Sequence, residues 1–177
     1  MSTQYTISVE NNRGANTNYA VFMEPPPPPQ FSGGQQPLLN VWYTVFVPDQ
    51  GSYHIETGSD FRAWVGTVPA TPAPGVVVSS AMSLPAQLGT QTSPGSTFDF
   101  KVSYSFPTID AISPTSRPGA YEIDTGTDFT LPNNTYLVGL AKVNNRGQAA
   151  PVVSMCPLHN MKIQISPKMK FFVSESK

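Results

Sequence analysis

Proline and glycine are spread so evenly along this chain that long helices have little room. Its 177 residues include 19 Pro and 13 Gly, and the longest stretch free of both is residues 1–13. An average helix needs about 11 to 12 uninterrupted residues, and a proline in its interior costs about 3 kcal/mol. The remaining windows are therefore expected to form short strands, which predicts an all-β fold.

Hydrophobic periodicity supports this expectation. Phe98, Phe100 and Val102 alternate with polar residues, as in a strand with one buried face. The same alternation occurs at Tyr5, Ile7 and Val9 and at Met161, Ile163 and Ile165. Runs that are apolar on both faces, typical of central strands, occupy residues 19–23, 39–47, 76–78, 136–140 and 170–173.

These windows predict a single domain over residues 1–177, an antiparallel β-sandwich of about ten to twelve short strands. A Pro/Gly-rich loop is expected at about 24–37. Its five prolines, residues 25–29, favour an extended polyproline II form. That form suits a stiff connection across the end of the sandwich; docking on an aromatic groove of a partner is the alternative.

Charge limits the classes of partner. The chain has 10 Lys and Arg against 11 Asp and Glu, and only 12% of its residues are charged. This balance lacks the basic footprint of a nucleic-acid-binding protein, so no nucleic-acid partner is expected. A weakly charged surface repels copies of itself little, so self-association is the expected partnership.

Targeting signals and cysteine content indicate the compartment. The first residues lack the basic and apolar regions of a signal peptide, and no apolar run reaches membrane-spanning length. No membrane partner is therefore expected. Cys156 is the only cysteine, so no internal disulfide can form, which suits a reducing, cytoplasmic location.

An internal repeat supplies candidate ligand-binding residues. Residues 53–61 (YHIETGSDF) match residues 121–129 (YEIDTGTDF), which suggests reuse of one strand-turn-strand unit. Each copy presents two carboxylates around a glycine, Glu56 with Asp60 and Asp124 with Asp128. If both turns lie at one end of the sandwich, four carboxylates can bind calcium or sugar hydroxyls. Capping of a hairpin by Asx-turns is the alternative.

Several segments also carry a resemblance to known proteins. They are residues 7–14 (ISVENNRG), 19–22 (YAVF), 41–46 (VWYTVF), 121–125 (YEIDT) and 163–167 (IQISP). Together they resemble a loosely defined group of small microbial all-β proteins, nearly from end to end. The resemblance implies an intracellular β-sandwich without an assigned reaction, and it carries over no catalytic residue.

The remaining candidates are aromatic or nucleophilic. Trp42 or Trp64, if exposed beside polar groups, can stack on a sugar ring; core packing is the alternative. Cys156 and His159 are spaced for a Cys-His pair, with His54 the only other histidine, but a small buried thiol is the commoner arrangement. The G-x-S-x-G, GxGxxG and Walker motifs are absent, so catalysis is not expected.

Three function hypotheses follow. The first is a non-catalytic structural or self-associating protein. The alternative is a glycan- or small-ligand-binding module, lectin-like and without a cofactor unless calcium takes part. The third is an enzyme with an unfamiliar site around His54, Cys156 or His159.

Overall fold

A computed structural model describes residues 3–26, 37–144 and 146–176. This part of the chain contains fourteen strands and no helix, which confirms the all-β prediction. It accordingly contains no helix that is long and apolar enough to cross a membrane. The strands are β1 (Gln4–Glu10), β2 (Thr17–Met23), β3 (Leu38–Leu39), β4 (Tyr43–Val47), β5 (Ser52–Gly58), β6 (Phe61–Thr67), β7 (Ser79–Ala86), β8 (Gly95–Ser103), β9 (Phe106–Ser116), β10 (Tyr121–Thr125), β11 (Tyr136–Val143), β12 (Ala149–Met155), β13 (Lys162–Ile165) and β14 (Phe171–Ser176).

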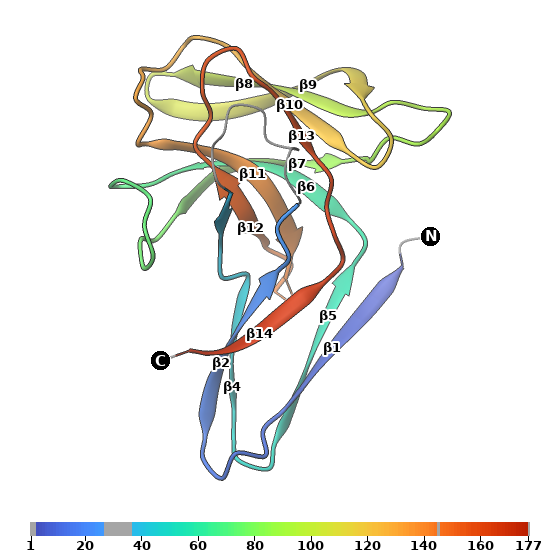
Figure 1. Cartoon of the computed structure of the whole chain (residues 1–177), viewed down its shortest axis with the longest axis vertical. Helices are drawn as coiled ribbons and strands as arrows, with labels where there is room; N and C mark the ends of the chain where they lie inside the picture. Colours follow the sequence, from blue (N-terminus) through green and yellow to red (C-terminus); the bar gives the residue numbers. More distant parts are fainter. Residues whose placement is uncertain (1–2, 27–36, 145, 177) are drawn as a thin grey trace.

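Two sheets form a sandwich in the upper part of Figure 1. A four-stranded sheet in the order β13-β10-β8-β9 packs on a five-stranded sheet in the order β3-β12-β11-β6-β7. The alternation seen in the sequence places Phe98 and Phe100 of β8 in the core between them, where they join Val65 and Leu140 of the second sheet. The main core therefore consists of the inward residues of both sheets.

Two smaller sheets, β14-β2-β4 and β1-β5, form the lower part of the molecule (Figure 1). They enclose a second core of Val9, Tyr19, Val45 and Val47. Strand β5 belongs to this lower part, whereas β6, which follows after two residues, belongs to the five-stranded sheet. The bend between β5 and β6 thus marks the junction of the two parts.

Among the described strands, one pair departs from the antiparallel pattern. Strands β8 and β10 run parallel, and the chain crosses the end of the sheet between β9 and β10 to reach this position. The crossing segment lies against the backbone of Gly89 and Gly95, where an added Cβ atom would overlap the carbonyl oxygens of Arg117 and Ala120. Glycine at these two positions permits the close approach.

Several predicted strands differ in detail. Residues 76–78 form no strand; Val76 and Val78 instead cover a small cluster around Trp64 on the outer face of the five-stranded sheet. The window 39–47 is divided between β3 and β4, and β14 is an edge strand rather than a central one. Of the Pro/Gly-rich loop at 24–37, residues 27–36 lie outside the described part of the chain.

Candidate functional site

The first carboxylate turn, residues 56–60, borders a surface hollow of about 600 Å³, here called the first hollow. Three segments that are distant in sequence line it: β1, the end of β5 with its bend, and the end of β11. The lining residues are Gln4, His54, Glu56, Thr57, Gly58, Asp60, Val143 and Asn144. This volume falls within the usual range of small-ligand sites, about 300 to 1,000 Å³.

Strand pairing between β1 and β5 decides which side chains reach the first hollow. Ser8 is paired with His54, and Gln4 with Gly58. Because neighbouring residues of a strand point to opposite faces, His54 and Glu56 share one face, while Ile55 is fully buried on the other. Period-2 alternation therefore separates the polar lining of the hollow from the core.

The polar groups of the first hollow are accessible to solvent. His54, Glu56 and Asp60 are exposed. The ring of His54 is oriented by a hydrogen bond of 3.0 Å between its Nδ1 atom and the hydroxyl of Ser8 on the paired strand. An imidazole and two carboxylates thus lie at one opening.

Lys142 stabilises the wall of the first hollow from inside the protein. Its side chain, in a residue that is only 1% exposed, donates hydrogen bonds from Nζ to the carbonyl oxygens of Gly58 at 2.6 Å and Asp60 at 3.2 Å. The same Nζ atom lies 4.6 Å from the centre of the Phe61 ring. Burial lowers the pKa of Lys142 to about 8. The lysine thereby ties β11 to the bend between β5 and β6.

This set of groups suits reversible binding of a hydroxyl-rich molecule. Carboxylates accept hydrogen bonds, while the amides of Gln4 and Asn144 both donate and accept them. The lining has few apolar side chains, so recognition would depend on polar contacts. In the described residues, no three His, Cys, Asp or Glu side chains come together in a way that could hold a metal ion.

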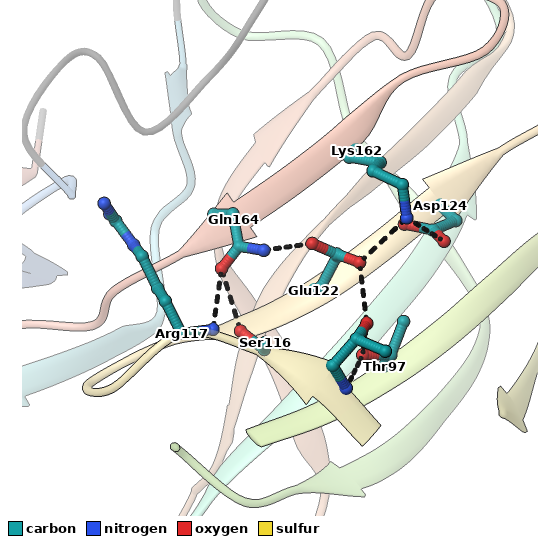
Figure 2. Close-up of polar contacts among 8 residues, drawn as sticks. Thr97, Ser116, Arg117, Glu122, Asp124, Lys162 and Gln164 are labelled. Carbon is teal, nitrogen blue, oxygen red and sulfur yellow. Dashed lines mark hydrogen bonds and ion pairs between the residues drawn. The ribbon is translucent and has the colours of Figure 1, made fainter. Parts of the chain in front are cut away.

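The second carboxylate turn, residues 124–128, has different surroundings. Asp124 belongs to a polar network on one face of the four-stranded sheet (Figure 2). At its centre lies Glu122, 4% exposed, which accepts hydrogen bonds from Thr115 at 3.2 Å, from Lys162 at 3.3 Å and from the amide of Gln164. These contacts join β9, β10 and β13 rather than opening toward a ligand.

Burial and charge act in opposite directions on Asp124. Its Oδ2 atom lies 3.0 Å from Nζ of Lys162, while its Oδ1 atom is buried and lacks a hydrogen-bond partner in the described structure. Burial raises the pKa of Asp124 in spite of the lysine. The hydrogen bond to Asp124 raises the pKa of Lys162 in turn.

Asp128 lies apart from Asp124, at a second hollow of about 320 Å³. Its Oδ2 atom accepts a hydrogen bond of 2.6 Å from the backbone N–H of Val102 at the end of β8. Glu56 and Asp60 line the first hollow, Asp128 lines the second, and Asp124 lines neither. Among the residues that the structure covers, the four carboxylates therefore do not form the single site that the sequence suggested.

Both tryptophans are core residues. Trp42 is 3% exposed and donates from Nε1 to the carbonyl of Lys142 at 3.3 Å. Trp64 is fully buried and donates from Nε1 to the hydroxyl of Ser80 at 2.8 Å. Neither ring is available to stack on a sugar, because each indole is enclosed by the protein.

Cys156 and His159 have separate environments. Burial raises the pKa of the Cys156 thiol, so the reactive thiolate is disfavoured at neutral pH. The Nε2 atom of His159 forms a hydrogen bond of 2.5 Å with the carbonyl oxygen of Phe129, and its ring packs edge-on against the Phe129 ring at 4.9 Å. These contacts give His159 a structural role beside the second turn.

Comparison with known proteins assigns the chain to a family. A model of the family described as RhiA matches residues 2–177. The chain belongs to the RhiA family. This assignment is more specific than the loose group of small all-β proteins that the sequence segments resemble. No curated protein and no solved structure matched the chain.

Sequence reasoning missed several contributors to the first hollow in this RhiA-family chain. Gln4 reaches it through the pairing of β1 with β5, and Asn144 follows β11, which pairs with β6; no local pattern discloses either pairing. The sequence does contain an indication that Lys142 is important, because it is the only charged residue in the otherwise apolar segment YLVGLAKV of β11. A charged residue within such a run must be hydrogen-bonded or neutral when buried.

Proposed function

We propose that this protein binds a small, hydroxyl-rich ligand of the sugar or polyol class in the first hollow, without transforming it. The observation that carries the proposal is the convergence of His54, Glu56 and Asp60 with the amides of Gln4 and Asn144 around about 600 Å³ of open space. Hydroxyl groups both donate and accept hydrogen bonds, so they match this mixture.

Rigidity of the wall supports the proposal. Lys142 fixes the carbonyls of Gly58 and Asp60, and the ribbon of β1 and β5 fixes His54 opposite Ser8. Binding groups that are held in place before the ligand arrives lose little conformational entropy on binding. The site is therefore built on paired strands and a clamped bend rather than on a long loop.

The test is a titration of isotope-labelled protein with a panel of monosaccharides and polyols, followed by NMR, with and without calcium. Binding should shift the amide signals of the lining residues. Glu56→Gln and Asp60→Asn should each weaken binding about tenfold or more, because a hydrogen bond to a charged group contributes about 1.5–3 kcal/mol and about 1.4 kcal/mol corresponds to tenfold.

Glu10→Gln provides the matched control, since Glu10 lies on β1 but does not line the first hollow. It should bind like the wild type. A requirement for calcium would assign the carboxylates to the metal, and the same substitutions would then abolish the calcium effect. If no ligand of the panel shifted the amide signals of the lining residues, the proposal would be refuted.

A second candidate function is self-association into a structural assembly. Exposed apolar side chains on one sheet support it. Strands β14 and β4 are the two edges of the three-stranded sheet, and they expose Phe172 (46%), Val173 (43%) and Phe46 (56%). Unpaired strand edges with apolar side chains favour pairing between chains.

Light scattering coupled to size exclusion, over a wide range of concentration, tests this second proposal. Phe172→Ser should reduce the assembly, whereas Val77→Ser should not, because Val77 is exposed but lies outside all sheets. A strict monomer under all conditions would contradict it. A cytoplasmic location is proposed with both functions, since the lone Cys156 suits a reducing compartment.

A further inference from the structure

The turn between β8 and β9 contains an unusual combination of residues. Tyr104 and Ser105 both have positive φ, 50° and 63°, in a two-residue connection between the paired residues Ser103 and Phe106. Turns of this kind favour Asn, Asp and Gly, because other side chains are strained in the left-handed region. A tyrosine at the first of these positions is therefore unfavourable for the turn.

Burial does not compensate for this strain. Tyr104 is fully exposed, so its ring adds nothing to the hydrophobic core. Residues with a strained backbone cluster at active sites and ligand-binding segments of folded proteins. Tyrosine is suited to such a role because it offers a rigid, amphipathic face to a ligand.

The turn that carries Tyr104 borders the second hollow. Tyr104 lines this hollow of about 320 Å³ together with Asp128, Thr130, Asn134 and other residues of the loop after β10. Asp128, Thr130 and Asn134 are exposed to solvent. The exposed Tyr104 thus stands at the rim of an opening that presents three hydrogen-bonding side chains.

The base of the second hollow is ordered by aromatic packing. Phe129 is buried and packs edge-on against Phe100 and Tyr136, with ring centres 5.7 Å and 6.3 Å apart. The hydrogen bond from Val102 N–H holds the carboxylate of Asp128. Two independent observations, the strained exposed tyrosine and the polar hollow with a fixed carboxylate, therefore coincide.

We propose that the second hollow binds a sugar ring, with Tyr104 stacking on its apolar face and Asp128 and Asn134 bonding its hydroxyl groups. The site is separate from the first hollow and does not depend on the function proposed there. Among the described residues, its lining contains no Lys or Arg, and Asp128 repels anions, so phosphate-bearing ligands are disfavoured. The polar lining also disfavours an apolar peptide segment.

The test uses glucose, galactose, mannose, N-acetylglucosamine and their short oligomers, followed by NMR of the labelled full-length protein. Binding should shift the amides of Val102, Ser105 and residues 128–131 and 133–136. Tyr104→Asn should weaken binding by about tenfold or more through loss of the stacking face, while Tyr104→Phe should retain it. Phe106→Asn, an exposed aromatic of the same hairpin that does not line the hollow, is the matched control.

A stability measurement separates this proposal from simple damage to the fold. Because asparagine fits the left-handed turn, Tyr104→Asn should raise the Tm by about 2–4 °C while it weakens binding. Wild-type binding by Tyr104→Asn would overturn the proposal. So would the absence of shifts at the second hollow with every sugar, whereas shifts confined to the first hollow would support only the function proposed there.

Discussion

The two carboxylate turns share a sequence but not a structural role. In the first copy, β5 passes through a short bend into β6, and Glu56 and Asp60 remain exposed at an open hollow. In the second copy, β10 is followed by a loop, and Asp124 joins a network with Lys162 on the face of a sheet. Similar residues therefore perform different tasks in different surroundings.

Neighbouring strands account for this difference. Within the described residues, strand β5 pairs only with β1, and His54 and Glu56 on its polar face are exposed. Strand β10 lies between β8 and β13, and Glu122 accepts hydrogen bonds from Thr115 of β9 and from Lys162 and Gln164 of β13. The position equivalent to Glu122 in the first copy is His54, which is exposed. Strand pairing, rather than the local motif, therefore determines whether such a turn is exposed to a ligand.

The lysine near each turn offers the largest expected contrast. The pKa of Lys142 falls from 10.5 in the unfolded chain to about 8 in the folded protein, so between these values the unfolded state binds more protons. Stability should therefore rise with pH across this window, by up to about 3 kcal/mol relative to Lys142→Met. Urea unfolding at a series of pH values measures the difference between the two profiles.

Lys162→Met is the matched control for that experiment. Lys162 is largely exposed and its pKa is raised, so the stability it contributes is lost as pH rises through its folded pKa. The two lysine variants should thus differ from wild type in opposite directions. Parallel profiles for wild type and Lys142→Met would contradict the role assigned to Lys142.

A slightly smaller contrast is expected at the equivalent positions 54 and 122. Glu122→Ala removes the acceptor shared by Thr115, Lys162 and Gln164, and should cost about 2–3 kcal/mol of unfolding free energy. His54→Ala should cost less than about 0.5 kcal/mol, because the side chain is exposed. Chemical denaturation of both variants tests this, and equal losses would remove the distinction between the two copies.

Asp128 should show an intermediate effect on stability. Asp128→Ala removes the acceptor for the backbone N–H of Val102 and should cost about 1 kcal/mol. Glu56→Gln, at an exposed position of the first copy, should change the unfolding free energy by less than about 0.5 kcal/mol. The midpoint of denaturation measures both, and a larger loss for Glu56→Gln would indicate that the first turn also has a structural role.

The smallest effect is expected from Asp124. Its pKa is raised by burial above the ordinary value of 3.8, so in the window just above that value the folded state binds more protons than the unfolded state. Stability should fall with rising pH in this window for the wild type, and Asp124→Asn should lack that decline. Thermal unfolding at a series of acidic pH values measures the slope of stability with pH for both proteins. A steeper decline in Asp124→Asn than in the wild type would contradict this prediction.

Much of the fold could be predicted because its signals are local. Proline and glycine spacing excluded long helices, and alternation identified the buried face of β8 through Phe98 and Phe100. The strand predicted at residues 76–78 is not formed, because an apolar run also suits a segment that covers a sheet. Val76 and Val78 pack over Trp64 without strand pairing. The parallel pairing of β8 and β10 depends on a crossing that no local pattern encodes.

The candidate sites were less predictable than the fold. Glu56 and Asp60 were identified by their spacing, but their separation from Asp124 and Asp128 depends on which strands become neighbours. Trp42 and Trp64 were candidates for an exposed aromatic face, whereas Tyr104 provides one. The strain at Tyr104 is visible only in its backbone φ angle, so neither composition nor hydrophobic periodicity could indicate it.

The most direct test compares the two turns with one ligand. The ligand is the sugar or polyol that shifts the amide signals of the residues lining the first hollow. Calorimetric titration with it would measure a dissociation constant for the wild type, for Glu56→Gln and for Asp124→Asn. Our account predicts binding weaker by about tenfold or more for Glu56→Gln and an unchanged constant for Asp124→Asn. An equal loss in both variants, or a loss in Asp124→Asn alone, would contradict it.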